Sequence, residues 1–169
     1  MMFFCSTCGK KHNMDEISFG ANNPFQWEFL SENERKNSLL TQEQCRIKKS
    51  ESTHYFIRAC MDIPIKGTDQ FFAWGVWVSL SEQSFLEISE HWDDPERINF
   101  GPYFGWLCTR IPEYPDTMLL KEMVHQRQIG LRPLVQLEPT DHPLAMHQRD
   151  GIESEKLKQI IIKLLHQNR

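Results

Sequence analysis

The sequence predicts an α+β fold, with a mostly antiparallel sheet, an N-terminal segment like a zinc knuckle, and a C-terminal amphipathic helix packed on the sheet. Three observations lead to this prediction. Stretches with alternating apolar residues, typical of strands, gather in the middle of the chain. The short turn "KGTD" joins two of these stretches, and a connection this short favours antiparallel neighbours. The clearest helical periodicity comes last, which differs from the repeating strand–helix–strand order of parallel sheets.

The chain has 169 residues, of which 40% are hydrophobic and 25% are charged, and this size and composition predict one globular domain over residues 1–169. We divide this domain into a metal-knuckle and helical lead-in at 1–45, a sheet region at 53–138 and a C-terminal helix at 151–167. No internal repeat or low-complexity linker interrupts it.

Charge and hydropathy argue against several classes of partner. The formal net charge of −4 argues against a broad surface for nucleic acid or anionic membrane. No apolar run approaches the roughly 20 residues that span a bilayer, and the opening "MMFFCSTC" lacks the basic and apolar regions of a signal peptide. We therefore expect a cytoplasmic protein with reduced cysteines, and neither nucleic acid nor membrane among its partners.

The first elements are a helix and two strands. In "FLSENERKNSLL", Ser31 can cap a short surface helix, because Glu34 follows at the capping-box spacing. "HYFIRACMDIPI" alternates as a strand does, and the turn "KGTD" joins it to "QFFAWGVWVSL" as an antiparallel hairpin. The second strand is apolar on both faces, which predicts a central strand that is covered on both sides.

The later elements follow from caps and turns. Ser81 begins a helix that runs to about Trp92, and "YFGWLCTRI" is a further strand. "TMLLKEMVHQR" fits a strand or a helix, and we favour a strand because turn-rich segments flank it and the extended "LRPLVQLEP" follows. "DHPLAMHQRDG" leads into a short helix. The final helix, "ESEKLKQIIIKLLHQ", carries an apolar stripe that is made of Leu157, Ile160, Ile161, Leu164 and Leu165.

The stretch "CSTCGKKH" predicts a metal site. Two cysteines separated by two residues deliver two thiolates to one ion, and His12 lies close enough to be a third ligand. A redox pair would open a helix after a strand, but nothing before Cys5 could supply that strand. The alternative is that Cys5 and Cys8 are two thiols without a ligand.

The fourth ligand is expected from afar. Cys45 follows a polar helix and precedes the first core strand, so we expect a structural zinc ion on Cys5, Cys8, His12 and Cys45. Cysteines at 60 and 108 lie in apolar strands, where a free thiol usually fills the core.

Long motifs give a resemblance to a known family. "CSTCGKKH", "SFGANNP", "CRIKKSESTHYFIRACMDIPI", "FFAWGVWVSLSEQSF", "YFGWLCTRIPEYPDT" and "MVHQRQIGLRPLVQLEPTDHPLAMHQRDGI" together resemble DUF2199, a bacterial domain of unknown function, over nearly the whole chain. The family pattern has Cys, Cys and His at Cys5, Cys8 and His12, and a later cysteine at Cys45. The resemblance implies a bacterial source and brings no activity with it.

A second group of polar residues surrounds "EPTDHP". Asp141 could orient the imidazole of His142 for acid–base work, and Glu138 could accept a proton. Arg132, or Arg58 on the first core strand, could clamp a carboxylate or a phosphate. The alternative is a plain turn in which Asp141 caps a helix, beside a solvated strand face.

Two functions of different classes remain open. The first is a small cytosolic protein-interaction module with a structural zinc, whose partner is another protein. Its contact surface could include the aromatic residues of "NFGPYFGW", which could instead line a pocket or pack in the core. The second is a small-molecule enzyme or ligand-binding protein that uses the Glu138, Asp141 and His142 turn with Arg58 or Arg132. No catalytic residue can be assigned, because no known catalytic motif occurs in the sequence. A deep polar pocket beside His142 would favour the second function.

Overall fold

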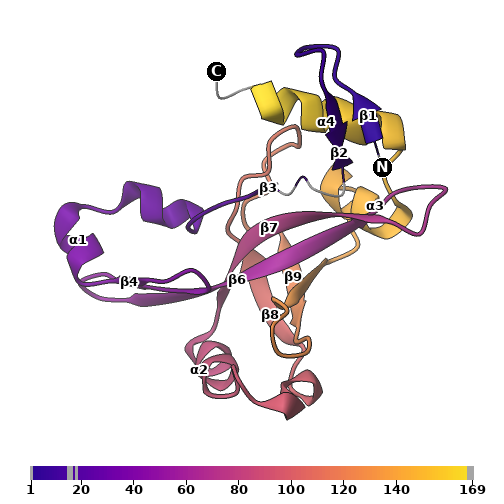
Figure 1. Cartoon of the computed structure of the whole chain (residues 1–169). Coiled ribbons are helices and arrows are strands. Elements are labelled where there is room, and N and C mark those ends of the chain that lie inside the picture. The colour runs from indigo at the N-terminus through magenta and orange to yellow at the C-terminus, as the bar shows by residue number, and fades with distance from the viewer. Residues whose placement is uncertain (1, 15–16, 18, 167–169) are drawn as a thin grey trace.

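The structure is a computed structural model that describes residues 2–14, 17 and 19–166, and it confirms the α+β class (Figure 1). Its strands are β1 (Met2–Phe4), β2 (Lys11–Asn13), β3 (Phe19–Gly20), β4 (Leu39–Leu40), β5 (Gln44–Lys48), β6 (Thr53–Pro64), β7 (Phe71–Leu80), β8 (Tyr103–Leu107), β9 (Lys121–His125) and β10 (Leu134–Leu137). Its helices are α1 (Glu32–Lys36), α2 (Glu82–Glu90), α3 (Pro143–Asp150) and α4 (Ser154–His166), with 3-10 turns η2 (Phe25–Phe29) and η3 (Pro95–Asn99).

Five of the strands close into a barrel. β7 pairs with β6 and β8, β9 pairs with β8 and β10, and β10 returns to β6. These pairings are antiparallel except the last, in which β10 runs parallel to β6 at Leu134 and Cys60. The expectation of a mostly antiparallel sheet is therefore met only in part. The sheet closes on itself through a parallel contact, and β3 also runs parallel to β7.

The length of β6 explains how the barrel closes. Along one side, β6 pairs with β7 from Tyr55 to Pro64. Along its other side, residues 53–57 pair with β5, and Cys60 further along pairs with β10. One long, twisted strand thus has two successive neighbours on the same side, and β5 is left outside the ring.

β7 lies inside the sheet, as its sequence predicts, with one face buried and the other covered in part, since Phe71 at its start is 64% exposed. Its even-numbered side chains from Phe72 to Leu80 point into the main core. On the opposite face, Trp77 is fully buried in a second cluster that also includes Phe56 and Ile47. The indole Nε1 of Trp77 donates a hydrogen bond to the carbonyl of Ala21 at 3.0 Å, which satisfies its polar atom in this buried position.

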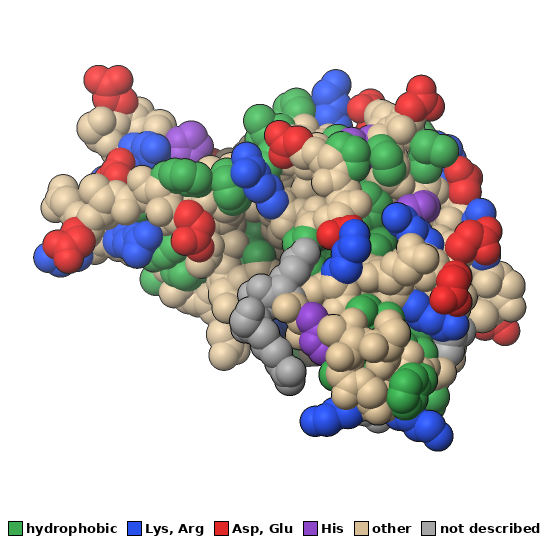
Figure 2. Space-filling model, turned by 90° about the horizontal axis from the view of Figure 1, so that it is seen from above, with side chains coloured by type: hydrophobic (Ala, Val, Ile, Leu, Met, Phe, Trp, Pro, Cys, Tyr) green, Lys and Arg blue, Asp and Glu red, His purple; other side chains and the backbone are tan. Residues whose placement is uncertain are grey.

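The second cluster lies where an arm, formed by η2, α1, β4 and β5, leaves the barrel (Figure 1). The capping box predicted for α1 is present, because the Ser31 side chain accepts from the backbone of Glu34 and the Glu34 carboxylate accepts from Ser31. Figure 2 shows the arm projecting from the rest of the molecule with acidic and basic side chains interspersed.

The C-terminal helix joins the main core. Leu157, Ile160 and Ile161 are buried in the same cluster as Phe3 of β1 and the inner residues of the barrel. Figure 1 shows α4 above one end of the barrel, alongside β1 and β2. The described part of α4 ends at His166, and position 167, where the helix was expected to end, lies outside the described residues. No helix in the described part of the chain is long and apolar enough to cross a bilayer.

Candidate metal centre

The knuckle "CSTCGK" connects the two strands of an N-terminal hairpin. β1 and β2 pair antiparallel, with Phe3 opposite His12. Inside the loop, the amide of Gly9 donates to the carbonyl of Cys5 at 2.9 Å, and the amide of Cys5 donates to Lys10 at 2.9 Å. Gly9 has a φ of 67°, a conformation that glycine adopts without the steric cost that a Cβ would add. This tight turn places both thiols on the same side as His12.

The structure brings together three of the expected ligands. The Sγ atoms of Cys5 and Cys8 and a ring nitrogen of His12 all lie within 4.8 Å of one another, and Cys8 Sγ is 3.2 Å from His12 Nε2. Ligand atoms around a tetrahedral zinc are separated by roughly 3.3–3.8 Å, given the usual Zn–S and Zn–N distances. The group could therefore hold a metal ion after small adjustments of side chains.

A fourth side chain comes from the other end of the chain. His166, in the last turn of α4, places its Nε2 3.2 Å from Cys5 Sγ. Cys5 is fully buried, whereas Cys8, His12 and His166 are half-buried. His166 contacts Cys5 but lies outside the group of three whose ligand atoms are all within 4.8 Å of one another. Its imidazole, like the side chains of that group, is among the ligand types that zinc prefers.

The surroundings of Cys5 lower the pKa of its thiol. Burial acts to raise its pKa, but hydrogen bonds from the backbone of Cys8, from the side chain of His166 and from the backbone of Thr7 outweigh burial and lower the pKa to about 6. The thiolate is the form of cysteine that binds metal ions, so this environment favours ligation at neutral pH.

Cys45 does not join this group. It is fully buried in the second cluster, among Ile47, Phe56 and Trp77, and burial raises the pKa of its thiol to about 12. The structure thus places Cys45 as a core residue beneath the arm, and His166 stands beside Cys5 instead. No local pattern predicted this contact, because His166 lies 161 positions from Cys5 and outside any recognisable metal motif.

The turn "EPTDHP" does not assemble an acid–base site with the arginines. His142 caps α3 by accepting at Nδ1 from the amide of Leu144 at 3.1 Å, and its Nε2 lies 3.2 Å from the carbonyl oxygen of Asp116. The side chains of Glu138 and Asp141 are exposed to solvent.

The two expected arginines lie at a different place. Arg132 precedes β10 while Glu138 follows it, so the strand separates them by about 20 Å at the usual rise per residue. Arg132 forms an ion pair with Glu43, and the charges of both act on Arg58. Glu43 was not singled out from the sequence, because only the closed barrel brings the β4–β5 turn next to the loop before β10.

Comparison with known proteins gives one match. The model of the family described as "Uncharacterized protein conserved in bacteria (DUF2199)" matches residues 4–152. Neither the curated proteins nor the solved structures include one that matches the chain. The matched region contains Cys5, Cys8 and His12, and it ends before α4 and His166.

Proposed function

The chain belongs to DUF2199, an uncharacterized family conserved in bacteria, and from this premise we propose that it is a zinc-binding protein whose metal is structural. The proposed ligands are Cys5, Cys8, His12 and His166. A cytoplasmic location, where thiols stay reduced, suits this ligand set.

One observation carries the proposal: Cys5 and Cys8, which share a tight knuckle, each have a histidine nitrogen 3.2 Å from their sulfur. The two histidines come from different elements, β2 and α4. Four protein ligands fill a tetrahedral zinc and leave no open position for water, which is the arrangement of a structural rather than a catalytic site.

The N-terminal hairpin would gain stability from such a metal link. An isolated two-stranded hairpin is marginally stable at best, and of the three residues of β1 only Phe3 is buried, while Met2 and Phe4 are more than 60% exposed. A zinc ion held by β1–β2 on one side and α4 on the other would fix both ends of the chain to the barrel. Binding energy at such a site contributes directly to folding.

Metal analysis tests the proposal. Protein purified without added metal or chelator is expected to carry about one zinc per chain. Replacing zinc with cobalt should give the visible absorption of tetrahedral Co²⁺ together with thiolate charge transfer. The absence of stoichiometric metal, or a cobalt spectrum without thiolate bands, would contradict the proposal.

We keep the protein-interaction function as a second proposal, because one surface favours it. Phe104 and Trp106 on the outer face of β8 are 48% and 37% exposed, and their rings meet edge to face at 5.2 Å between centroids. Exposed aromatic residues are enriched where proteins bind one another. Crosslinking in cells tests this role by comparing the parent with a double variant, Phe104→Ser and Trp106→Ser. The variant should keep the melting temperature of the parent but lose the crosslink to a partner protein. Unchanged crosslinking would contradict this role.

A further inference from the structure

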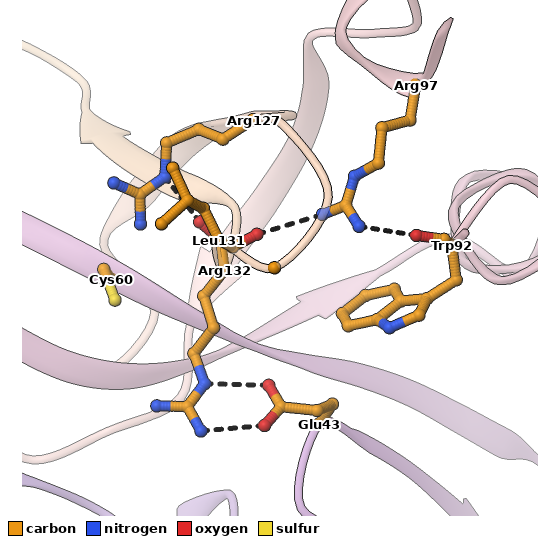
Figure 3. Close-up of a pocket in the computed structure, with 8 residues that line it drawn as sticks. Glu43, Cys60, Trp92, Arg97, Arg127, Leu131 and Arg132 are labelled. Atoms are coloured by element: carbon orange, nitrogen blue, oxygen red, sulfur yellow. Dashed lines mark hydrogen bonds and ion pairs between the residues drawn. The ribbon is translucent and has the colours of Figure 1, made fainter. Parts of the chain in front are cut away.

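A cavity of about 420 Å³ lies away from the metal centre, between the β4–β5 turn, the outer side of β6, the segment after α2 and the β9–β10 loop (Figure 3). Residues that are far apart in the sequence line it: Glu43, Cys60, Trp92, Arg97, Arg127, Gly130, Leu131 and Arg132. Three of these are arginines and one is a glutamate, so the lining carries a formal net charge of +2. The cavity is therefore suited to an anion.

Two of the arginines are held in fixed positions. Arg97 is 1% exposed, and its Nη1 and Nη2 donate to the carbonyls of Trp92 at 2.6 Å and Leu131 at 3.2 Å. Arg132 donates through Nε and Nη2 to both oxygens of Glu43, at 2.8 and 2.7 Å. A bidentate pair of this kind fixes the plane of the guanidinium group.

Arg127 offers unused donors. Its Nε donates to the carbonyl of Arg132 at 2.6 Å, and this bond orients the guanidinium group. Its two outer nitrogens have no hydrogen-bond partner among the described residues, and Figure 3 shows no interaction drawn from them. Nη1 of Arg132 is likewise without a partner within the described part of the chain. Oriented arginine donors without partners are the groups that bind the oxygens of an anion.

Two buried arginine nitrogens without partners add a second, independent observation. One is Nε of Arg97, which lines the cavity. The other belongs to Arg58, which does not line the cavity but lies close enough for the charges of Arg132 and Glu43 to act on it. Its Nε is buried and has no hydrogen-bond partner in the described structure. Burial and then the positive charge of Arg132 lower the pKa of Arg58, while Glu43 and Cys60 act in the opposite direction. Like charges gathered in a partly buried place repel one another, and a bound anion would relieve that repulsion.

We propose that this cavity binds a small organic phosphate, with the phosphate between Arg127 and Arg132 and the organic part against Trp92 and Leu131. A phosphate monoester carries close to two negative charges at neutral pH, which matches the charge of the lining. The planar donors of arginine fit phosphate oxygens in pairs. The volume lies within the range of about 300–1,000 Å³ that is usual for small-molecule sites.

Titration calorimetry with inorganic phosphate tests the charge-bearing part of the site. We expect saturable binding that weakens as sodium chloride is raised, because salt screens the attraction. Arg127→Gln should weaken binding about tenfold or more, since it removes charged hydrogen bonds. Arg149→Gln is the matched control: Arg149 is half-exposed and paired with Asp150 on α3, outside the cavity, so this variant should bind as the parent does.

Glu43→Gln should change the affinity for phosphate in the opposite direction to Arg127→Gln. It removes the only acidic residue of the lining and should tighten phosphate binding several-fold, whereas a purely structural role for Glu43 predicts no tightening.

Phosphate should also protect the thiol of Cys60 from alkylation, because Cys60 lines the same cavity. Mass spectrometry of the peptide that contains Cys60 measures this protection. The proposal is overturned if no saturable binding occurs up to roughly 10 mM phosphate, or if Arg149→Gln weakens binding as much as Arg127→Gln does.

Discussion

His166 Nε2 lies 3.2 Å from Cys5 Sγ, although 161 positions separate the two residues in the chain. The contact joins the last turn of α4 to the knuckle at the end of β1. It brings an imidazole from α4 beside the three-residue group that could hold a metal ion, and His166 is therefore the fourth ligand that we propose.

Replacement of His166 should affect metal binding strongly. A structural zinc site with four ligands binds with about 10–16 kcal/mol, so we expect His166→Ala to weaken zinc binding roughly hundredfold. His166→Cys, which restores a ligand, should recover most of that loss. The control is His54→Ala, because His54 is exposed, lies in β6 away from the metal group, and has a side chain that hydrogen-bonds Ser52. A competition titration with a chromophoric chelator measures all three variants, and equal affinities for His166→Ala and the parent would remove His166 from the site.

Removal of the metal should loosen only part of the molecule. Chelation is expected to speed amide hydrogen exchange in β1, β2 and α4, because a zinc ion on the proposed ligands would link these elements. Exchange in β6 and β7 should stay slow, since they pair along most of their length in the barrel. β5, which carries Cys45, should also stay protected, and faster exchange there on chelation would indicate that Cys45 is a ligand after all.

Much of the fold follows from local patterns in the sequence. The alternation of apolar residues located β6 and β7, and the capping residues Ser31 and Ser81 located the starts of two helices. The closure of the barrel could not be predicted in this way, because it depends on one parallel contact between Leu134 and Cys60, which no local pattern specifies.

Only the residues of the candidate metal centre that are close together in the sequence could be predicted. The spacing of Cys5, Cys8 and His12 predicted the three-residue group that could hold a metal ion, but the position of His166, the proposed fourth ligand, depends on how α4 docks. Cys45 and Ile47 alternate with exposed residues in β5, so the strand pattern around Cys45 was already that of a core position. Arg132 was expected to bind an anion, but the cavity around it was not predicted, because Glu43, Arg97 and Arg127 join it only after the barrel closes.

The docking of α4 can be tested at Ile161, which is fully buried in the main core. Ile161→Asp should lower the free energy of unfolding by about 3–5 kcal/mol, because it buries a charge without a partner. Gln159→Asp, at an exposed position of the same helix, should change it by less than about 0.5 kcal/mol. Urea unfolding measures both variants. Equal stability of the two would show that the apolar face of α4 is not docked.

A buried glutamate gives the protein a pH dependence. Glu122 of β9 is 1% exposed, lies opposite Gly105 and Leu137, and has no hydrogen-bond partner for either carboxylate oxygen among the described residues. Burial raises its pKa well above the usual value of 4.5. The folded protein therefore keeps a proton that the unfolded chain releases. The stability that this proton confers is full below about pH 4.5 and is lost as the pH rises.

Glu122→Gln should remove this dependence. Relative to the parent, the free energy of unfolding of the variant should rise with pH from about pH 5 to 8, by at most about 1.4 kcal/mol per pH unit. The difference between the two proteins isolates Glu122 from other titrating groups. Urea unfolding across this range measures it, and a difference that does not change with pH would mean that Glu122 ionises normally in the folded protein.

X-ray absorption at the zinc edge, on protein as purified, tests the central claim most directly. Coordination by Cys5, Cys8, His12 and His166 predicts two sulfur ligands at about 2.3 Å and two imidazole nitrogens at about 2.0–2.1 Å. In His166→Ala, one imidazole should disappear from the spectrum while both sulfurs remain. A spectrum of the parent with three sulfurs, or with one imidazole and a water oxygen, or a protein that contains no zinc, would contradict the account.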